Sequence, residues 1–192
     1  ENIQIGGCKV SKKLTGAAAY FSQLDITAVS LCGKIRIKIC TKNELDMLMN
    51  GELQSTAIFG EMLKKYSGNA PDNMPEAELS RLMGVYIDGI TKIIEDWGEY
   101  LKVPESSFPL ENSLPECSFP ASTLPEKLVA EYTGLSILRV GDLDYLLYRL
   151  YLADAVKYNL GRTEKGIDYL NAAHLEMFSE YDRSAFLSGG AK

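Results

Sequence analysis

The chain has 192 residues, of which 46% are hydrophobic and 24% are charged, a composition typical of globular proteins and unlike that of disordered chains. Its formal net charge of -6 repels phosphate backbones, and its short basic stretches lack interleaved aromatic residues, so we expect no nucleic-acid partner. No apolar run in the sequence is long enough to cross a bilayer. We therefore expect no membrane partner and a cytoplasmic location.

Four cysteines lie far apart in the chain, at Cys8, Cys32, Cys40 and Cys117. Their spacing matches no zinc template, and the single histidine of the sequence, His174, has no second ligand-type residue one helical turn away. The glycines form no phosphate-binding motif either. We therefore predict four free thiols, a reducing compartment, and neither a metal nor a cofactor.

The clearest break in the chain is a proline-rich stretch at residues 103–125. Prolines remove backbone donors and push the preceding residues toward extended conformations, so no helix runs through this stretch. Apolar residues such as Phe108 and Phe119 recur within it, which favours an ordered connector packed on its neighbours over a solvated linker. The connector separates an α+β N-terminal lobe (residues 1–102) from an all-α C-terminal lobe (residues 126–192). The predicted fold class is therefore mainly α, with a small N-terminal β element.

The N-terminal lobe opens with strand-like and helical patterns. Ile3 and Ile5 alternate with polar residues ahead of two glycines, which is typical of a strand. The apolar residues within 16–24 predict a short helix after it.

A β-hairpin is predicted next. Residues 35–39 alternate isoleucines with basic residues, which is the pattern of a half-buried strand, and residues 26–31 supply its partner. A two-residue turn at Gly33–Lys34 would place Thr27 opposite Cys40.

Three helices are predicted in the rest of this lobe. Thr41 and Glu44 form a capping box in front of the first helix. The second helix covers residues 53–66. Pro75 suits the first position of the third helix, whose apolar residues recur at three- and four-residue steps as far as Lys102.

The C-terminal lobe reads as helices throughout. A short helix covers residues 125–132, and Asp142 is the predicted N-cap of a helix that ends at Leu160. That second helix is apolar nearly all round, so we expect protein to surround it on most sides. Thr163 is the predicted cap of the next helix, and residues 182–187 add a last turn.

The sequence contains no recognisable catalytic motif. His174 lies on or beside an apolar helical stripe, where a structural role is the favoured interpretation. Asp154 lies within the apolar helix and needs a partner, because an unpaired buried charge is costly. An ion pair with Arg149, Lys157 or a residue elsewhere in the chain is the favoured account, and a glycosidase-like carboxylate pair is the less favoured one. We therefore predict a protein that is not an enzyme.

Tyrosines are dense on the helix that ends at Leu160. Tyr145, Tyr148 and Tyr151 fall on successive turns. A row of tyrosines usually packs in a core with its hydroxyls at the rim, but tyrosine is also a favoured anchor of protein interfaces. These three residues are the candidates for protein binding.

The C-terminal lobe carries a series of short helix-cap phrases. They are Leu-Val-Ala-Glu-Tyr-Thr-Gly-Leu-Ser at 128–136, Leu-Asp-Tyr at 143–145, Arg-Thr-Glu-x-Gly-x-x-Tyr-Leu at 162–170 and Asp-Arg at 182–183. This series resembles the C-terminal helical part of small virion-assembly proteins of the tail-assembly-chaperone type, which are encoded beside the tail genes of phages and prophages of Gram-positive bacteria.

The resemblance implies a non-enzymatic protein that holds or delivers other phage proteins in the host cytoplasm. Its partner would then be a protein, such as a phage structural protein. A phage-borne inhibitor or regulator of a host enzyme is the alternative, and an enzyme of another class comes third. A concentration-dependent oligomer or a long apolar groove would favour assembly, an exposed acidic face would favour the inhibitor, and a deep pocket with convergent carboxylates would favour the enzyme.

Overall fold

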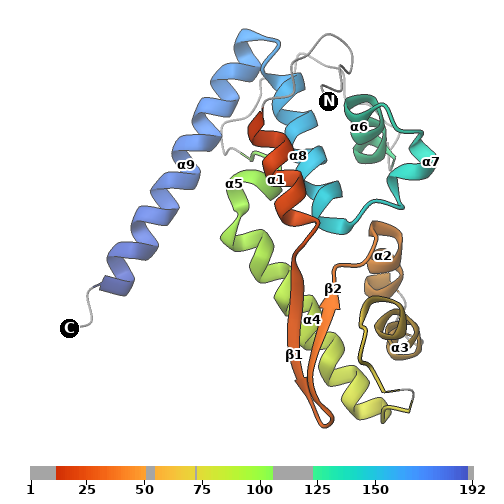
Figure 1. The fold of residues 1–192 in the computed structure, drawn as a ribbon. Coiled ribbons are helices and arrows are strands. Elements are labelled where there is room, and N and C mark those ends of the chain that lie inside the picture. Colours follow the sequence, from red (N-terminus) through yellow and green to blue (C-terminus); the bar gives the residue numbers. More distant parts are fainter. Residues whose placement is uncertain (1–11, 51–54, 72, 106–122, 190–192) are drawn as a thin grey trace.

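The computed structural model describes residues 12–50, 55–71, 73–105 and 123–189, with side chains described from residue 16 to residue 177. Within these ranges the chain is mainly helical and contains one two-stranded antiparallel sheet near its N-terminus (Figure 1). This confirms the predicted fold class. The strand predicted at Ile3 and Ile5 lies outside the described residues, as does the part of the proline-rich connector that holds Phe108 and Phe119.

In the described residues, one helix precedes the two strands, and all the later elements are helices. Their order is α1 (Lys12–Phe21), β1 (Asp25–Ser30), β2 (Gly33–Lys38), α2 (Lys42–Asn50), α3 (Ser55–Tyr66), α4 (Glu76–Asp96), α5 (Gly98–Leu101), α6 (Leu124–Thr133), α7 (Ile137–Val140), α8 (Tyr145–Leu160) and α9 (Glu164–Gly189).

The β-hairpin forms with a different turn from the predicted one. Ser30 pairs with Gly33, so the turn residues are 31 and 32, and Thr27 lies opposite Arg36 instead of Cys40. The reason is local: Gly33 has φ 114°, a backbone conformation that side chains disfavour and glycine accepts. A glycine with positive φ directly after the turn residues is a common feature of β-hairpins.

The hairpin packs on α4 through a close backbone approach. Ile26 of β1 lies against Gly89 of α4, where a Cβ in place of the glycine hydrogen would come within 2.9 Å of the isoleucine Cδ1. Gly89 therefore lets the strand and the helix approach closely, and α3 packs on β2 next to them.

The predicted capping box begins α2 as expected. The Thr41 backbone N–H donates to Glu44 Oε2 at 3.1 Å, and the Glu44 N–H lies 3.4 Å from Thr41 Oγ1. The two orphan donors at this helix start are thus satisfied reciprocally. Thr163 likewise caps α9, where its Oγ1 accepts from the Gly166 N–H at 3.0 Å.

The long helix after Pro75 is shorter than predicted. It ends at Asp96 instead of reaching Lys102, because Trp97 leaves the helical region at φ -114° and ψ 31°. The short helix α5 then begins at Gly98. The Trp97 side chain packs on aromatic residues of α1, so a tertiary contact outweighs the helical pattern here.

The N-cap of α8 is Asp144 and not Asp142. The Asp144 carboxylate accepts from the Leu146 N–H at 2.9 Å and from the Leu147 N–H at 3.4 Å. Asp142 instead pairs with Arg139 on the surface, at 3.0 Å. The C-terminal helix α9 also differs from the prediction. It continues unbroken to Gly189, whereas a separate last turn was predicted at residues 182–187.

The junction between β2 and α2 fixes the start of α8. The backbone N–H of Tyr145 donates to the Cys40 carbonyl at 2.9 Å, and the N–H of Lys42 donates to the Leu143 carbonyl at 2.9 Å. Thr41 also bridges Asp144 in an isolated β-bridge. These bonds fix the backbone in front of Tyr145, so that α8 begins at Tyr145 and Asp144 occupies the N-cap position.

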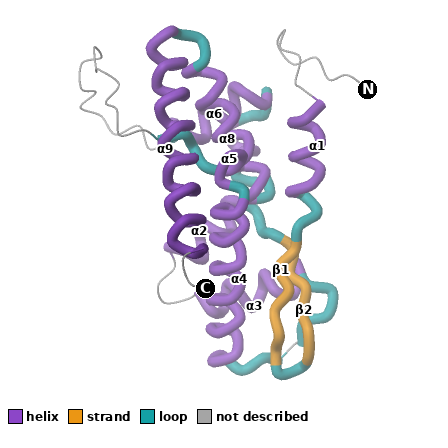
Figure 2. The backbone as a smooth tube through the Cα atoms, turned by 90° about the vertical axis from the view of Figure 1, so that its left-hand side faces the viewer, coloured by secondary structure: helices purple, strands orange, loops and turns teal. Residues whose placement is uncertain are grey.

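Helix α8 lies at the centre of the described structure (Figures 1 and 2). It packs on α6, α5, α9, α1 and α2, as its all-round apolar pattern predicts. Leu146 and Leu150 join a core that also contains residues of the hairpin, α2, α3 and α4. A second core forms around Val129 of α6 and Leu152 of α8. The two predicted lobes therefore share buried residues.

Candidate functional site

The three tyrosines predicted as protein-binding candidates have different surroundings on α8. Tyr148 is 5% exposed and belongs to the second core, where burial raises its pKa to about 12. Tyr145 and Tyr151 are half-buried, and the rings of Tyr145 and Tyr148 stack with their centroids 6.4 Å apart. Tyr148 therefore contributes to folding. A contact of Tyr145 or Tyr151 with a partner stays a prediction.

A polar cluster lies beside Tyr148, between α2 and α6. The Lys42 ammonium is 2.6 Å from Asp46 Oδ2, 3.0 Å from Glu126 Oε1 and 5.2 Å from the centre of the Tyr148 ring. Burial opposes ionisation of Glu126, but the Lys42 ammonium reverses that effect and lowers the pKa of Glu126. Lys42 thus pairs with carboxylates of both helices and ties α2 to α6, while Glu126 Oε2 is buried without a hydrogen-bond partner among the described residues.

A second polar cluster joins α2 to α3 through Glu44. Its carboxylate accepts from Lys65 Nζ at 2.7 Å and from the Tyr66 hydroxyl at 2.5 Å, in addition to the capping bond from Thr41. Burial opposes ionisation, yet these donors together lower the pKa of Glu44 to about 2. A carboxylate that is so well satisfied is a structural anchor and a poor proton acceptor.

Among the described residues, neither Arg149 nor Lys157 forms the ion pair expected for Asp154. Arg149 Nε donates to the Leu101 carbonyl at 3.1 Å, and Lys157 Nζ donates to the Glu99 carbonyl at 2.6 Å. The carbonyls at the end of the short helix α5 need donors, and these two side chains supply them. Asp154 Oδ2 is left buried without a hydrogen-bond partner, and burial raises the pKa of Asp154 to about 6.

The residues considered for metal or redox chemistry are dispersed. Cys32 is exposed and Cys40 is buried, and both are free thiols as predicted. Cys8 and Cys117 lie outside the described residues. His174 is on the exposed side of α9 and not on its packing stripe. Across the described ranges, no three His, Cys, Asp or Glu side chains gather as a metal site would require.

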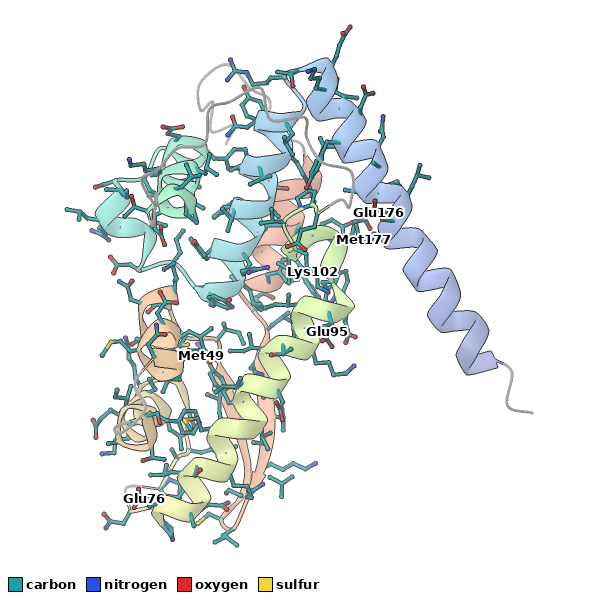
Figure 3. All side chains as sticks on the ribbon, turned by 180° about the vertical axis from the view of Figure 1, so that it is seen from behind. Met49, Glu76, Glu95, Lys102, Glu176 and Met177 are labelled. Carbon is teal, nitrogen blue, oxygen red and sulfur yellow. The ribbon has the colours of Figure 1, made fainter. Side chains whose placement is uncertain are left out.

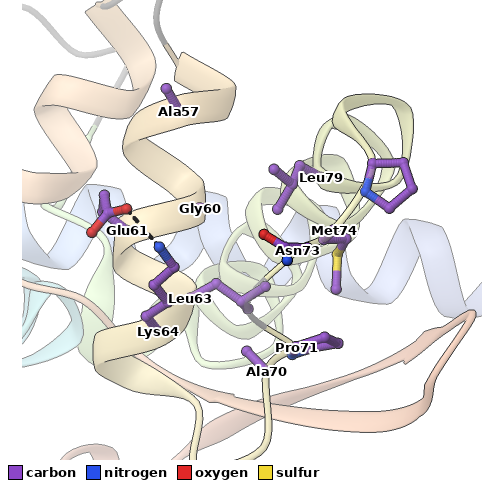
Figure 4. Close-up of a pocket in the computed structure, with 11 residues that line it drawn as sticks. Ala57, Gly60, Glu61, Leu63, Lys64, Ala70, Pro71, Asn73, Met74 and Leu79 are labelled. Carbon is purple, nitrogen blue, oxygen red and sulfur yellow. Dashed lines mark hydrogen bonds and ion pairs between the residues drawn. The ribbon is translucent and has the colours of Figure 1, made fainter.

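A hollow of about 520 Å³ lies between α3 and the loop that leads into α4 (Figure 4). Its lining is largely apolar and includes Leu63, Met74 and Leu79. The charged lining residues, Glu61 and Lys64, form an exposed ion pair at 2.9 Å. An exposed pair of this kind is a common surface feature that contributes little to stability.

A cluster of aromatic residues from α1 and the α4–α5 junction was missed by the sequence analysis. Tyr20 and Trp97 are 47% and 39% exposed, and their ring centroids are 5.3 Å apart. The sequence pattern placed Trp97 on the apolar stripe of the long helix. The one sequence signal for a helix end at this point was Gly98, directly after Trp97, because glycine has weak helix propensity.

The C-terminal half of α9 extends beyond the body of the molecule (Figures 1 and 3). Ala173 is 4% exposed, whereas Met177, one turn further along the same face, is 38% exposed. Leu175 is 70% exposed. The packing face of α9 therefore loses its cover where the helix diverges from α4 and α5. Among the described residues, no helix combines the length and apolar character needed to cross a membrane.

Comparison of the chain with protein-family models, with curated proteins and with solved structures finds no match. The resemblance of residues 128–183 to virion-assembly proteins therefore stays a prediction from the sequence. A proposal for the function has to be argued from the surfaces of the molecule.

Proposed function

We propose that this protein works by binding another protein, as an assembly factor of the tail-assembly-chaperone type, and not by catalysing a reaction. The observation that carries the proposal is the part of α9 that extends beyond the body of the molecule (Figure 1), at whose start the described side chains of Leu175 and Met177 are exposed. The helix has 26 residues, which corresponds to a length of roughly 39 Å. Its packing partner in the described structure is α8.

A protruding helix favours a partner for a physical reason. Helices in water gain most of their stability from tertiary packing of one apolar face. On the packing face of α9 the exposed fraction rises from 4% at Ala173 to 38% at Met177, and Leu175, on nearly the opposite side of the helix, is 70% exposed. An amphipathic helix that docks into a partner's groove recovers the missing burial.

The position of α9 in the sequence agrees with the resemblance described above. The Arg-Thr-Glu-x-Gly-x-x-Tyr-Leu phrase at 162–170 includes the cap and first turns of α9. The resembling proteins hold or deliver phage proteins during virion assembly. The partner that we propose is therefore a phage structural protein in the host cytoplasm.

The test compares two exposed leucines on different surfaces. Leu175→Asp changes α9, and Leu138→Asp changes a residue of α7 that is 84% exposed. Both variants should keep the melting temperature of the wild type, because neither side chain is buried. In pull-downs from phage-producing cells, we expect Leu175→Asp to reduce partner capture about thirtyfold, as for an interface anchor worth about 2 kcal/mol. Leu138→Asp should capture the partner normally.

Two results would count against the proposal. Equal capture by Leu175→Asp and by the wild type would remove α9 from the interface. Capture of a host enzyme, identified by mass spectrometry and inhibited in its own assay by the wild-type protein, would favour the inhibitor instead.

A further inference from the structure

Four aromatic side chains from two separate parts of the chain meet on one surface. Tyr20 and Phe21 end α1, Trp97 follows α4, and Tyr100 belongs to α5. The Trp97 ring is the common neighbour: its centroid lies 5.3 Å from Tyr20, 5.8 Å from Phe21 and 6.1 Å from Tyr100. The Phe21 ring is nearly perpendicular to it, at 88°.

These rings surround a hollow of about 250 Å³, which we call the aromatic hollow. Its lining consists of Gly16, Ala17, Tyr20, Phe21, Trp97 and Tyr100. Phe21 is 1% exposed and forms the buried side, whereas Tyr20 and Trp97 are partly open to solvent. The volume is below the roughly 300–1,000 Å³ of sites for drug-sized ligands, so a single side chain is a better match.

The helices around the aromatic hollow favour a cation. Helix α1 ends at Phe21, and its carboxyl end carries partial negative charge next to the rings, whereas the end charges of α4 and α5 offset each other at Trp97, which is both the C-cap of α4 and the N-cap of α5. Glu95 and Glu99 flank Trp97 and are exposed. The faces of aromatic rings also attract cations.

Two nearby lysines of the described structure are engaged elsewhere. Lys92 pairs with Asp96 at 3.2 Å, and Lys157 Nζ donates to the Glu99 carbonyl. The aliphatic carbons of Lys102 lie next to Gly98. The net charge of -6 adds a long-range attraction for a basic partner and repels an acidic one.

We infer that the aromatic hollow binds the guanidinium of an arginine side chain presented by the protein partner. Arginine fits better than lysine, because its planar guanidinium stacks on aromatic rings and is more weakly hydrated. The identity of the partner rests on the proposed function above, whereas the binding of a guanidinium does not.

The test uses the tryptophan of the hollow as its own reporter, because Trp97 is the single tryptophan of the chain. N-acetyl-arginine amide is titrated against the full-length protein at constant ionic strength, and N-acetyl-citrulline amide serves as a neutral probe of the same shape. We expect a saturable change in tryptophan fluorescence with arginine in the millimolar range, and a response at least about fivefold weaker with citrulline. Equal responses, or no response to arginine, would overturn the inference.

Two variants locate the binding, with one matched control. Tyr20→Leu removes one ring, and Tyr158→Leu removes an equally exposed tyrosine on α8, since both are 47% exposed. We expect arginine affinity to fall about threefold to fivefold in Tyr20→Leu and to stay unchanged in Tyr158→Leu. Gly16→Leu should weaken binding, because Gly16 lines the hollow and a Cβ there meets no atom within 4 Å, which leaves room for a leucine to compete with the ligand. Unchanged affinity in both Tyr20→Leu and Gly16→Leu, with wild-type melting temperatures, would place the arginine elsewhere.

The same probe separates this inference from the proposed function. Leu175→Asp leaves the aromatic hollow intact, so it should bind N-acetyl-arginine amide as the wild type does, even where partner capture is lost. Arginine binding without any captured partner would refute the proposed function alone. Partner capture that is unaffected by Gly16→Leu would refute the use of the hollow in that interaction.

Discussion

The Tyr86 hydroxyl connects α4 to the end of β2 in the interior of the molecule. It accepts from the Cys40 backbone N–H at 2.8 Å and donates to the Lys38 carbonyl at 3.0 Å. Tyr86 and Cys40 are both fully buried. Tyr86→Phe keeps the ring and removes the bridge, so its effect reports on these two hydrogen bonds and not on packing.

The expected cost follows from what is left unpaired. A buried donor without a partner costs about 1–3 kcal/mol, and the Lys38 carbonyl is closer to solvent, where water replaces the hydroxyl at little cost. We therefore expect Tyr86→Phe to lower the free energy of unfolding by about 2 kcal/mol, which corresponds to roughly 4–8 °C in melting temperature. The control is Tyr158→Phe, whose tyrosine is exposed and whose cost should stay below about 0.5 kcal/mol.

Urea denaturation followed by circular dichroism measures both variants, and amide exchange at Cys40 reports on the bond directly. Burial raises the pKa of Tyr86 above its ordinary value, so the contribution of its hydroxyl is complete below the unfolded pKa of about 10 and is lost as the pH rises further. The difference between wild type and Tyr86→Phe should shrink accordingly in alkaline solution. A loss below about 0.5 kcal/mol at pH 7, with unchanged exchange at Cys40, would refute the reasoning.

Three further measurements test the remaining polar groups. Asp144→Ala should lower the free energy of unfolding by about 1 kcal/mol and Asp142→Ala by less than about 0.5 kcal/mol, because the first aspartate caps α8; equal losses in urea denaturation would contradict this. Asp154→Asn should stabilise the protein by about 1 kcal/mol at pH 7 after allowance for partial exposure. Burial raises the folded pKa of Asp154 to about 6 from 3.8, so the contribution of Asp154 to stability is complete below pH 3.8 and is lost as the pH rises through 6. The stabilisation by Asp154→Asn should therefore vanish near pH 4. A variant that is less stable than the wild type at pH 7 would show that Asp154 has a partner. Iodoacetamide should modify Cys32 in the native protein but Cys40 only after unfolding, since burial raises the pKa of Cys40 to about 11; equal rates by peptide mass mapping would contradict the buried position.

The sequence predicted the features that depend on neighbouring residues. The capping box of Thr41 and Glu44 and the cap at Thr163 formed as expected, because each needs partners only three residues away. The short helix predicted at residues 125–132 is α6, which ends at Thr133 directly before Gly134, whose φ is 75°. Apolar periodicity also identified the central helix, since its pattern reports burial directly.

The incorrect predictions are those that contacts distant in sequence decide. Asp142 and Asp144 are both good caps, and the choice between them is made by the bond from Tyr145 to Cys40, about a hundred residues away in sequence. Trp97 continues the apolar pattern of α4, yet its ring packs on α1 and the helix ends there. A pattern within one segment cannot contain such information.

The candidate surfaces were less accessible to sequence analysis than the fold. The tyrosine row of α8 was visible because its members are close in sequence. The aromatic hollow combines residues near position 20 with residues near position 100, so no local pattern identifies it. The part of α9 that extends beyond the body of the molecule depends on where that body ends, which only the packing of the other helices determines.

The apolar character of α8 follows from its position between two cores. Leu146 and Leu150 are one turn apart and enter the first core, whereas Tyr148 and Leu152 are one turn apart and enter the second. Two residues correspond to roughly 200° around a helix, so the two rows lie on nearly opposite sides. A helix that serves two cores in this way has little room for a polar face, and Asp154 is left between them without a partner. Folding alone thus accounts for the apolar pattern of α8, and the surfaces left to explain by binding are the part of α9 that starts at the exposed Leu175 and Met177, and the aromatic hollow.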